Sequence, residues 1–366
     1  MKVLLVTPVP PPINGCSLAN SVLINRLSSV DDISIQIIDT NTQNVSSGKV
    51  GAFDISKVTS FLGSYKGLWR IVGCDIVYYT PGQTFFGIAK YIPFYLLAIL
   101  FKKPYLIHLH GNHLGNEYKL LTGIKKRIFK FFISRAAGGV VLSRSLRSNF
   151  DGLLPDDRIY EVPNFAQDSL IYQTAELQKP IDKLRILYLS NLMKEKGIED
   201  FLDCLELLKD QSIDFEADIA GKIEDESLES LSARLKSLEE YVKYHGVVQG
   251  EKKTKLLNES NVFVMPTYYR MEGQPIAIIE AMATGNIVVT TNYSGIPDIV
   301  STANGFFVEP RNPQSIAETL TKISGDLASG IAKISRTNMN YVKEHFTESI
   351  FSNNVLQILY AVSKSK

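Results

Sequence analysis

Cysteine is scarce in this 366-residue chain, and its distribution excludes two classes of site. Cys16, Cys74 and Cys204 are odd in number, lie far apart and form no Cys-x-x-Cys pair. A disulfide framework or a structural zinc site is therefore not expected, and this usage fits a reducing compartment. We expect a cytoplasmic protein.

Long hydrophobic runs are also missing. The longest, residues 91–101, falls well short of the roughly 20 residues that a membrane-spanning helix needs. Residues 1–6 are apolar after Lys2, but prolines follow at positions 8, 10, 11 and 12, so this run is too short for a signal-peptide core. We expect it to be a buried first strand, and we predict no transmembrane segment.

Two motifs are absent whose presence would indicate other chemistry. No Gly-x-Gly-x-x-Gly follows the first strand, which disfavours an ordinary dinucleotide dehydrogenase. No Asp-x-Asp occurs anywhere to hold a divalent metal against phosphates. The sequence therefore favours metal-independent chemistry, without a metal site or a bound cofactor.

Charge is nearly balanced over the whole chain but not along it. Residues 1–170 contain 18 Lys and Arg against 11 Asp and Glu, whereas the remainder contains 21 against 27. With 45% hydrophobic and 21% charged residues, the composition is that of a globular protein. The basic front and the acidic back suggest two domains with different partners.

Short apolar runs alternate with longer helical patterns, and the series begins again after residue 182. This alternation predicts the α/β class, with two Rossmann-like, doubly wound parallel-sheet domains facing a cleft that binds the ligand. We place the first domain at 1–168 and the second at 169–345, joined near 167–183. The last helix, within 346–366, either packs on its own domain or crosses back to the first. Strands are predicted at 2–6, 33–38, 76–79, 105–108, 139–142, 185–189, 215–220, 242–244, 262–265 and 287–291.

The most informative stretch runs from Glu272 to Glu280. It follows a predicted strand, and Pro275 suits the start of a helix that strong helix formers continue to Gly285. Backbone N–H groups at the helix start, together with the helix dipole, predict an anion site suited to a diphosphate. The residues that supply these groups are Gly273, Gln274, Ile276 and Ala277.

Glu272 and Glu280 flank this predicted anion site. Two carboxylates beside a phosphate are reasonable if they accept hydrogen bonds from hydroxyl groups, one set on a sugar and one on a ribose. Two glutamates at this spacing alone are also compatible with an ordinary solvated helix, so the surrounding residues decide between these interpretations.

Those residues carry a family resemblance. The segment E-G-Q-P-x-x-x-x-E-A-M-A-x-G at 272–285 resembles the Glu-x7-Glu signature of the retaining GT-B glycosyltransferases, the glycosyl transferases of group 1. The stretches S-G-I-P-D-I-V at 294–300 and N-G-F-F-V-E-P at 304–310 are similar to motifs that follow it, with Ser294 and Asp298 as departures. The resemblance implies that Glu272 binds hydroxyls of the donor sugar and Glu280 the nucleotide ribose.

The same resemblance extends to the stretch S-N-L-M-K-E-K-G at 190–197. It implies that Lys196 contacts the donor diphosphate. Asn191 stands where many family members have arginine. An asparagine has no charged planar fork, so stabilisation of the leaving group would rest more on Lys196 and on backbone N–H groups.

Two positions in the first domain, Gly15 and His110, also match the family pattern. Gly15 lies in a loop after the first strand that is expected to approach the phosphates and the acceptor, and Ser17 is a candidate cap for the next helix. His110 is expected near the reacting sugar, as a ligand of a hydroxyl or a phosphate oxygen. His108, His110 and His113 could suggest a metal, but the sequence shows no acidic or cysteine partner nearby.

Residues 119–135 combine Lys125, Lys126, Arg127 and Lys130 with apolar and aromatic residues. A basic amphipathic helix of this kind can lie on an anionic bilayer, here the inner face of the plasma membrane. It can equally pack its apolar face on its own sheet, and both interpretations stay open. No base-reading motif accompanies the basic patch, so nucleic acid is not an expected partner.

The function implied is a retaining, metal-independent transfer of a hexose or N-acetylhexosamine in polysaccharide biosynthesis. The donor would be a nucleotide-sugar, a UDP-sugar from family frequency, and the acceptor a glycan or a lipid-linked glycan. One alternative is a catalytically silent nucleotide-sugar sensor or scaffold, which Asn191 keeps open. Another is a different GT-B enzyme, such as a sugar-nucleotide epimerase, which should use other acid and base carboxylates.

Overall fold

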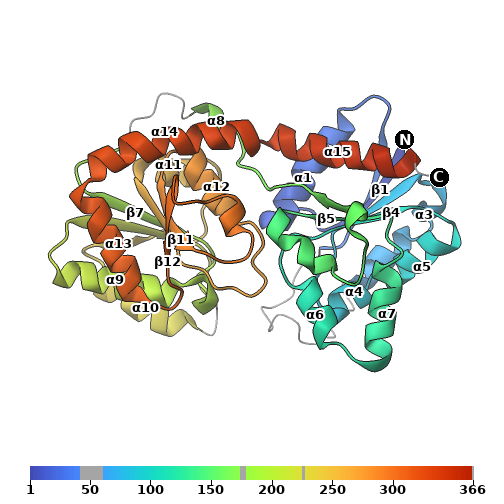
Figure 1. The fold of residues 1–366 in the computed structure, drawn as a ribbon, viewed down its shortest axis with the longest axis horizontal. Coiled ribbons are helices and arrows are strands. Elements are labelled where there is room, and N and C mark those ends of the chain that lie inside the picture. Colours follow the sequence, from blue (N-terminus) through green and yellow to red (C-terminus); the bar gives the residue numbers. More distant parts are fainter. Residues whose placement is uncertain (42–60, 174–178, 225–226, 365–366) are drawn as a thin grey trace. The chain divides into compact units, whose positions relative to one another are not determined.

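The computed structural model describes residues 1–41, 61–173, 179–224 and 227–364. The chain folds into two compact units (Figure 1). The first comprises Met1–Asn164 together with Ser349–Lys366, and the second comprises Phe165–Glu348. The predicted linker at 167–183 includes residues 174–178, which lie outside the described ranges.

The first unit is built on a six-stranded parallel sheet in the order β2-β1-β3-β4-β5-β6. The order reverses between β1 and β3, so the loops that follow these two strands diverge and leave room for a ligand. Five of the strands were predicted, whereas the short edge strand β6 was not. The strands are β1 (Lys2–Thr7), β2 (Ser34–Asp39), β3 (Ile76–Tyr79), β4 (Tyr105–His108), β5 (Gly138–Val141) and β6 (Ile159–Glu161).

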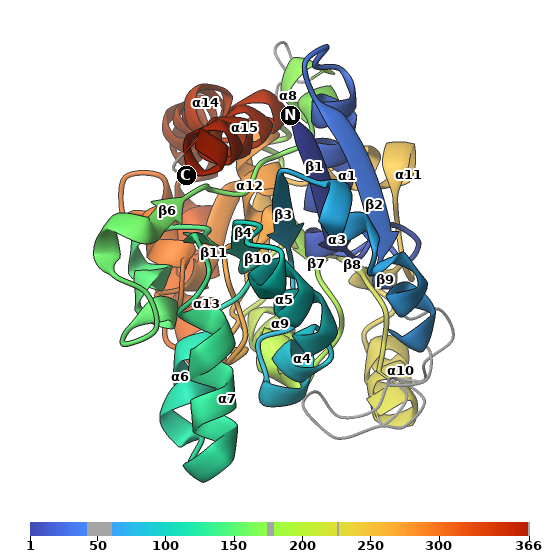
Figure 2. The same ribbon diagram turned by 90° about the vertical axis from the view of Figure 1, so that its right-hand side faces the viewer.

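Helices cover the first sheet because its inner strands are apolar on both faces. Leu4 and Val6 of β1 belong to a core that also takes in buried residues of α3, α4, α5 and α7, and Figure 2 shows α4, α5 and α7 gathered on one side of the strands. The helices of this unit are α1 (Gly15–Ser28), α3 (Arg70–Gly73), α4 (Phe85–Ala89), α5 (Ile92–Leu100), α6 (Leu114–Leu120), α7 (Gly123–Ile133) and α15 (Glu348–Lys364).

The last helix, α15, packs on the first unit. Nε of Arg26 donates to Oδ1 of Asn353 at 2.9 Å, and the Tyr360 hydroxyl donates to the carboxylate of Asp32 at 2.7 Å. The ring of Phe351 stacks near His108, with centroids 6.2 Å apart. The structure therefore decides the question that the sequence left open about this helix.

The second unit has a six-stranded parallel sheet in the order β12-β11-β10-β7-β8-β9. The first strand of the unit, β7, lies beside the fourth, β10, and the chain winds outward from this pair in both directions. That is the order of a doubly wound nucleotide-binding sheet, whose ligand site lies at the carboxyl ends of the central pair. The strands are β7 (Leu184–Leu189), β8 (Phe215–Ala220), β9 (Val242–Tyr244), β10 (Val262–Met265), β11 (Ile287–Thr291) and β12 (Gly305–Val308).

Helices cover both faces of the second sheet. Buried residues of α9, α10 and α13 form one core with the strands, and residues of α8, α11 and α12 form a second core on the other face. The prediction of doubly wound parallel sheets is thus confirmed for both halves of the chain. The helices are α8 (Asp168–Gln173), α9 (Ile198–Asp210), α10 (Leu228–Ser237), α11 (Gly250–Glu259), α12 (Ile276–Ala283), α13 (Pro313–Gly325) and α14 (Leu327–His345).

Gly221 ties the loops after β7 and β8 together. Its φ of +148° is a conformation that residues with a side chain rarely adopt. A Cβ atom there would lie 1.7 Å from the carbonyl oxygen of Ser190. Glycine is therefore required at position 221. In the same contact between the two loops, the N–H of Leu192 donates to the carbonyl of Lys222 at 2.8 Å.

We expect Gly221→Ala to destabilise the second unit by about 3 kcal/mol or more, because a backbone clash adds to a strained φ. The free energy of unfolding in urea, followed by circular dichroism, measures this loss. Gly325→Ala is the matched control, since a Cβ atom added at Gly325 would meet no other atom within 4 Å. Equal stability of the two variants would contradict the close approach at Gly221.

Candidate functional site

The candidate site lies in the second unit, at the point where β7 and β10 end side by side. The loop after β7 carries Lys196, and the loop after β10 carries Glu272. Nζ of Lys196 donates to Oε2 of Glu272 at 2.6 Å. The two residues are 76 positions apart, and the sheet order brings them together where doubly wound sheets bind their ligands.

Several contacts hold the Glu272 carboxylate in place. Its side chain is only 8% exposed, and the Thr267 hydroxyl donates to the same Oε2 atom at 3.0 Å. The Ser294 hydroxyl donates to the backbone carbonyl of Glu272. Lys196 also lies over the ring of Tyr269, with Nζ 5.1 Å from the centroid. Among the described residues, the bonds to Glu272 use one carboxylate oxygen and leave Oε1 for a ligand.

The loop and the helix that follow β10 agree with the predicted strand–loop–helix. Pro275 is the N-cap of α12, so the helix begins one residue later than a first-turn proline would place it. Gly273 and Gln274 are buried just before it, and the carbonyl of Gly273 accepts from the N–H of Gly295 at 3.1 Å. The helix ends before Gly285, which has a φ of +78°. The N–H of Ile278 donates to the carbonyl of Pro275 at 3.2 Å, whereas the N–H groups of Ile276 and Ala277 have no intrahelical acceptor.

Glu280 lies in the middle of α12 and is buried, with 4% of its side chain exposed. Nζ of Lys253, on α11, donates to Oε1 of Glu280 at 2.6 Å and to Oε1 of Gln167 at 3.0 Å. Burial raises the pKa of the Glu280 carboxyl, and the neighbouring Lys253 ammonium acts in the opposite direction.

Lys253 is a residue that the sequence analysis missed. It belongs to the run Lys252, Lys253, Thr254, Lys255, in which composition alone does not distinguish one lysine from another. Helical periodicity is the signal that could have found it. Positions 253, 256, 257 and 260 share one face, and Leu256, Leu257 and Ser260 are buried.

Asn191 is exposed at the carboxyl end of β7, in the same loop as Lys196. Gly15 opens α1 in the first unit, where Asn14 is the N-cap. The Asn14 side chain accepts from the N–H of Ser17, and the Ser17 hydroxyl accepts from the N–H of Asn14. Ser17 therefore completes a capping box as its third residue, whereas the sequence analysis had named it as the cap.

His110 lies in the first unit, just beyond β4. Its ring stacks on that of His108, with centroids 4.3 Å apart, and Nδ1 of His108 is hydrogen-bonded to the Tyr78 hydroxyl. Both ring nitrogens of His110 are buried without a protein partner among the described residues. Burial lowers the pKa of His110 to about 4, so the imidazole is neutral at pH 7 and keeps one donor and one acceptor for a ligand.

Hydrogen bonds to two side chains, Gln83 and Glu117, hold the segments around the loop that carries His110. Oε1 of Gln83 accepts from the N–H groups of His113 and Leu114, at 2.7 and 3.2 Å. Oε1 of Glu117 accepts from the N–H of Phe85 at 2.7 Å, and its Oε2 lies 3.4 Å from Nε2 of His113. The expectation that no acidic residue lies near these histidines was therefore wrong, because Glu117 is one helical turn away. Within the described ranges, no three His, Cys, Asp or Glu side chains gather as a metal site would require.

Residues 119–135 form two helices rather than one. α6 ends at Leu120, and α7 begins after Thr122. Phe129, Phe132 and Ile133 of α7 are buried, as the packing interpretation expected. Ile124 and Phe131 are exposed, at 68% and 41%. In the part of the chain that the structure describes, no helix is both long and apolar enough to cross a bilayer.

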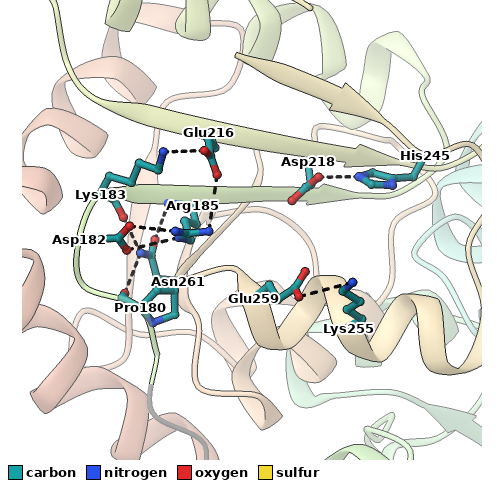
Figure 3. A network of polar contacts seen from close by, with 10 residues as sticks. All are labelled: Pro180, Asp182, Lys183, Arg185, Glu216, Asp218, His245, Lys255, Glu259 and Asn261. Carbon is teal, nitrogen blue, oxygen red and sulfur yellow. Dashed lines mark hydrogen bonds and ion pairs between the residues drawn. The ribbon is translucent and has the colours of Figure 1, made fainter. Parts of the chain in front are cut away.

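The second unit also contains a polar hollow of about 360 Å³ that Glu272 does not line, between α11 and the strands β7, β8 and β9. Figure 3 shows that several of its charged side chains pair with one another or with a neighbour. Glu216 pairs with Lys183 and Arg185, at 2.5 and 3.5 Å, and Asp218 is hydrogen-bonded to His245. We therefore place the candidate site at the ends of β7 and β10 and not in this hollow.

Because the His110 ring is buried, we predict how the free energy of unfolding depends on pH. Its pKa is about 4 in the folded protein and near 6.5 when unfolded, so the unfolded state binds more protons between these values. The free energy of unfolding should therefore fall as the pH drops from about 6.5 to about 4. Urea unfolding at a series of pH values should show a smaller slope for His110→Asn than for the wild type.

His345→Asn is the control, because His345 is half exposed on the second unit and should leave that slope unchanged. An NMR signal of the His110 ring that titrates near pH 6.5 would contradict the burial argument.

Comparisons with known proteins show what this chain is similar to. Residues 173–338, which include Lys196, Lys253, Glu272 and Glu280, match the family model of glycosyl transferases group 1. The putative colanic acid biosynthesis glycosyltransferase WcaL of Escherichia coli K12 is 25% identical over 206 residues, covering 55% of this chain and 51% of the relative. The amylovoran biosynthesis glycosyltransferase AmsK of Erwinia amylovora is 29% identical over 187 residues, covering 48% and 44%.

The chain therefore spans about half the length of these curated relatives. Among solved structures, that of Alr3699/HepE from Anabaena in complex with UDP superposes with a TM-score of 0.71, covering 99% of this chain and 100% of that one at 16% identity. Residues 173–338 are thus similar to the glycosyl transferases group 1 family, and the two six-stranded parallel sheets of the chain have the GT-B fold.

Proposed function

We propose that this protein is a retaining glycosyltransferase. It transfers a hexose or an N-acetylhexosamine from a nucleotide-sugar, a UDP-sugar, to a glycan or lipid-linked glycan during polysaccharide biosynthesis, without a metal ion. The observation that carries the proposal is the pairing of Lys196 with the buried Glu272 at the carboxyl ends of β7 and β10.

The pair supplies both kinds of group that a nucleotide-sugar requires. An ammonium group and the N-terminus of α12 attract a diphosphate, and a fixed carboxylate accepts hydrogen bonds from sugar hydroxyls. Without ligand, Lys196 and Glu272 neutralise each other, which lowers the cost of burying the carboxylate. When the donor binds, Lys196 turns toward the diphosphate and Glu272 toward the sugar. The contact between the two side chains is replaced by one from Lys196 to the diphosphate and one from Glu272 to the sugar hydroxyls.

The transfer itself needs stabilisation of a leaving diphosphate. The acceptor hydroxyl oxygen bonds to the anomeric carbon as the bond from that carbon to the diphosphate oxygen breaks, and the hydroxyl proton passes to the released diphosphate. Lys196 and the helix N-terminus oppose the charge that develops on this diphosphate. His110, neutral at pH 7, hydrogen-bonds a hydroxyl of the sugar.

The relatives support the biosynthetic role and the donor. WcaL and AmsK carry names of colanic acid and amylovoran biosynthesis, and HepE was crystallised with UDP. Asn191 favours one alternative, a silent nucleotide-sugar sensor, because an exposed amide contributes no charge to the leaving group. Such a sensor would bind the donor and leave it intact.

The test replaces the buried carboxylate by an amide of the same shape. We expect Glu272→Gln to lower kcat/KM for sugar transfer by about a hundredfold or more, because Lys196 and the sugar both lose a charged partner. Thermal shifts with a panel of nucleotide-sugars first identify the donor, since a bound ligand raises Tm. Release of the nucleotide and transfer to an acceptor glycan are then measured with that donor.

Glu344→Gln, an exposed change in the same unit, should be as active as the wild type. A Glu272→Gln enzyme that keeps full activity would overturn the site assignment. Donor binding by the wild type without any transfer or hydrolysis would instead support the sensor.

We further propose that the outward face of α7 contacts an anionic membrane where a lipid-linked acceptor resides. Residues 76–150 contain eleven Lys or Arg and one acidic residue, Glu117, which is already hydrogen-bonded within the protein. Lys125, Arg127 and Lys130 are exposed on α7 beside Ile124 and Phe131. Cations interleaved with exposed apolar side chains are what an interfacial helix presents to anionic lipid.

Replacing Lys125, Arg127 and Lys130 by alanine should weaken binding to phosphatidylglycerol-containing vesicles by about tenfold or more, since each cation near the surface contributes about 1 kcal/mol. Vesicle flotation and the salt dependence of binding measure the effect. The matched control removes three exposed cations of the second unit, Lys322, Lys333 and Arg336. If both triple variants bind vesicles like the wild type, the membrane contact is wrong.

A further inference from the structure

Lys253 reaches into the second unit from a helix whose neighbouring lysines point outward. Its side chain is 14% exposed, whereas that of Lys255 is 71% exposed. The Lys253 ammonium spans two acceptors on different segments, Oε1 of Glu280 at 2.6 Å and Oε1 of Gln167 at 3.0 Å. Gln167 therefore gives the ammonium a second acceptor besides the Glu280 carboxylate.

A buried carboxylate without such a partner tends to take up a proton. Transferring an unpaired charge from water to the protein interior is costly, and the group avoids this cost by becoming neutral. A neutral carboxyl group keeps a proton on one oxygen and accepts weaker hydrogen bonds than an ionised one. Two adjacent ribose hydroxyls are donors, and they bind most strongly to an ionised carboxylate.

The geometry leaves one oxygen of Glu280 for this purpose. Lys253 occupies Oε1, and no described residue donates a hydrogen bond to Oε2 through its side chain. The backbone of Glu280 is fixed, because the neighbouring residues of α12 are buried in the core. The orientation of the carboxylate therefore depends on the contact with Lys253.

We propose that Lys253 is a positioning residue for the nucleotide, which keeps Glu280 ionised and holds Oε2 free to accept the ribose hydroxyls of the donor. This inference rests on the proposed function, in which Glu280 binds the ribose. Lys253 itself does not contact the nucleotide. It acts on the part that every ribonucleotide shares, so its effect is independent of the base.

The experiment measures UDP binding by titration calorimetry for the wild type, Lys253→Met, Lys253→Arg and Glu280→Gln, with ADP and GDP as further probes. At pH 7 we expect Lys253→Met to raise the Kd for UDP by about tenfold or more, and Lys253→Arg to stay within about threefold of the wild type. Lys255→Met is the matched control, with no change expected. Circular dichroism checks that each variant is folded.

The dependence on pH separates positioning from simple packing. Without the Lys253 ammonium, the pKa of the Glu280 carboxyl rises further, because both influences that lower it are gone. In Lys253→Met the Kd for UDP should therefore fall as the pH increases from about 6 to about 8.5, as the carboxylate ionises. The wild type and Glu280→Gln should show only the smaller trend that ionisation of the terminal phosphate of UDP produces in every variant.

The double variant Lys253→Met with Glu280→Gln completes the cycle. If Lys253 acts through Glu280, the second substitution adds less than about threefold to the loss caused by Glu280→Gln alone. Wild-type protein should also bind 2′-deoxy-UDP more weakly than UDP, and this preference should shrink in Lys253→Met.

The outcomes distinguish the role of Lys253 from the role of Glu280. If Glu280→Gln weakens UDP while Lys253→Met binds as the wild type at every pH, the role of Lys253 is wrong and the proposed function stands. If Glu280→Gln binds UDP, ADP and GDP as the wild type does, the assignment of Glu280 to the ribose fails as well. Failure of the wild type to bind any of the three nucleotides overturns both.

Discussion

Two buried carboxylates, Glu272 and Glu280, each face a lysine ammonium at 2.6 Å, and this compensation of charge is the constraint on which the candidate site depends. An unpaired carboxylate at less than a tenth exposure would be neutral or would destabilise the fold. Lys196 and Lys253 come from different segments and are held by contacts of their own, with Tyr269 and Gln167. The protein can therefore bury two carboxylates side by side with the lysines that compensate their charge.

The doubly wound sheet makes this arrangement possible. Because β7 and β10 are neighbours that lead outward in opposite directions, the loops after them separate at their carboxyl ends. Lys196 and Glu272 lie in that opening, and α12 begins directly behind it. Gly221 allows the loops after β7 and β8 to approach more closely than a side chain would permit. In the first unit the corresponding reversal lies between β1 and β3, and α1 begins at Gly15 beyond it.

In the function that we propose, electrostatics gives these residues different roles. Lys196 is the cation that a diphosphate can recruit, because its partner Glu272 has an oxygen to offer a sugar in exchange. Lys253 is bound on two sides and stays with Glu280, so it serves the carboxylate rather than the ligand. His110 is neutral because both ring nitrogens are buried, which suits it to hydrogen bonding and not to charge stabilisation. Asn191 contributes no charge, which places more of that task on Lys196 and on the start of α12.

Local patterns in the sequence were enough to determine the alternation of strands and helices, the strand–loop–helix around Glu272 and the resemblance to the glycosyl transferases of group 1, because each depends on residues close together in the chain. The edge strands β6 and β12 were not predicted, although β12 is as long as β3, which was. Glu117, only four residues from His113, could have been found from helical spacing, whereas the break between α6 and α7 and the return of α15 to the first unit required the folded chain. So did the two ion pairs, which join residues 76 and 27 positions apart. Sequence periodicity can show that a lysine lies on a buried face, but only the packing of α11 against α12 decides which carboxylate it meets.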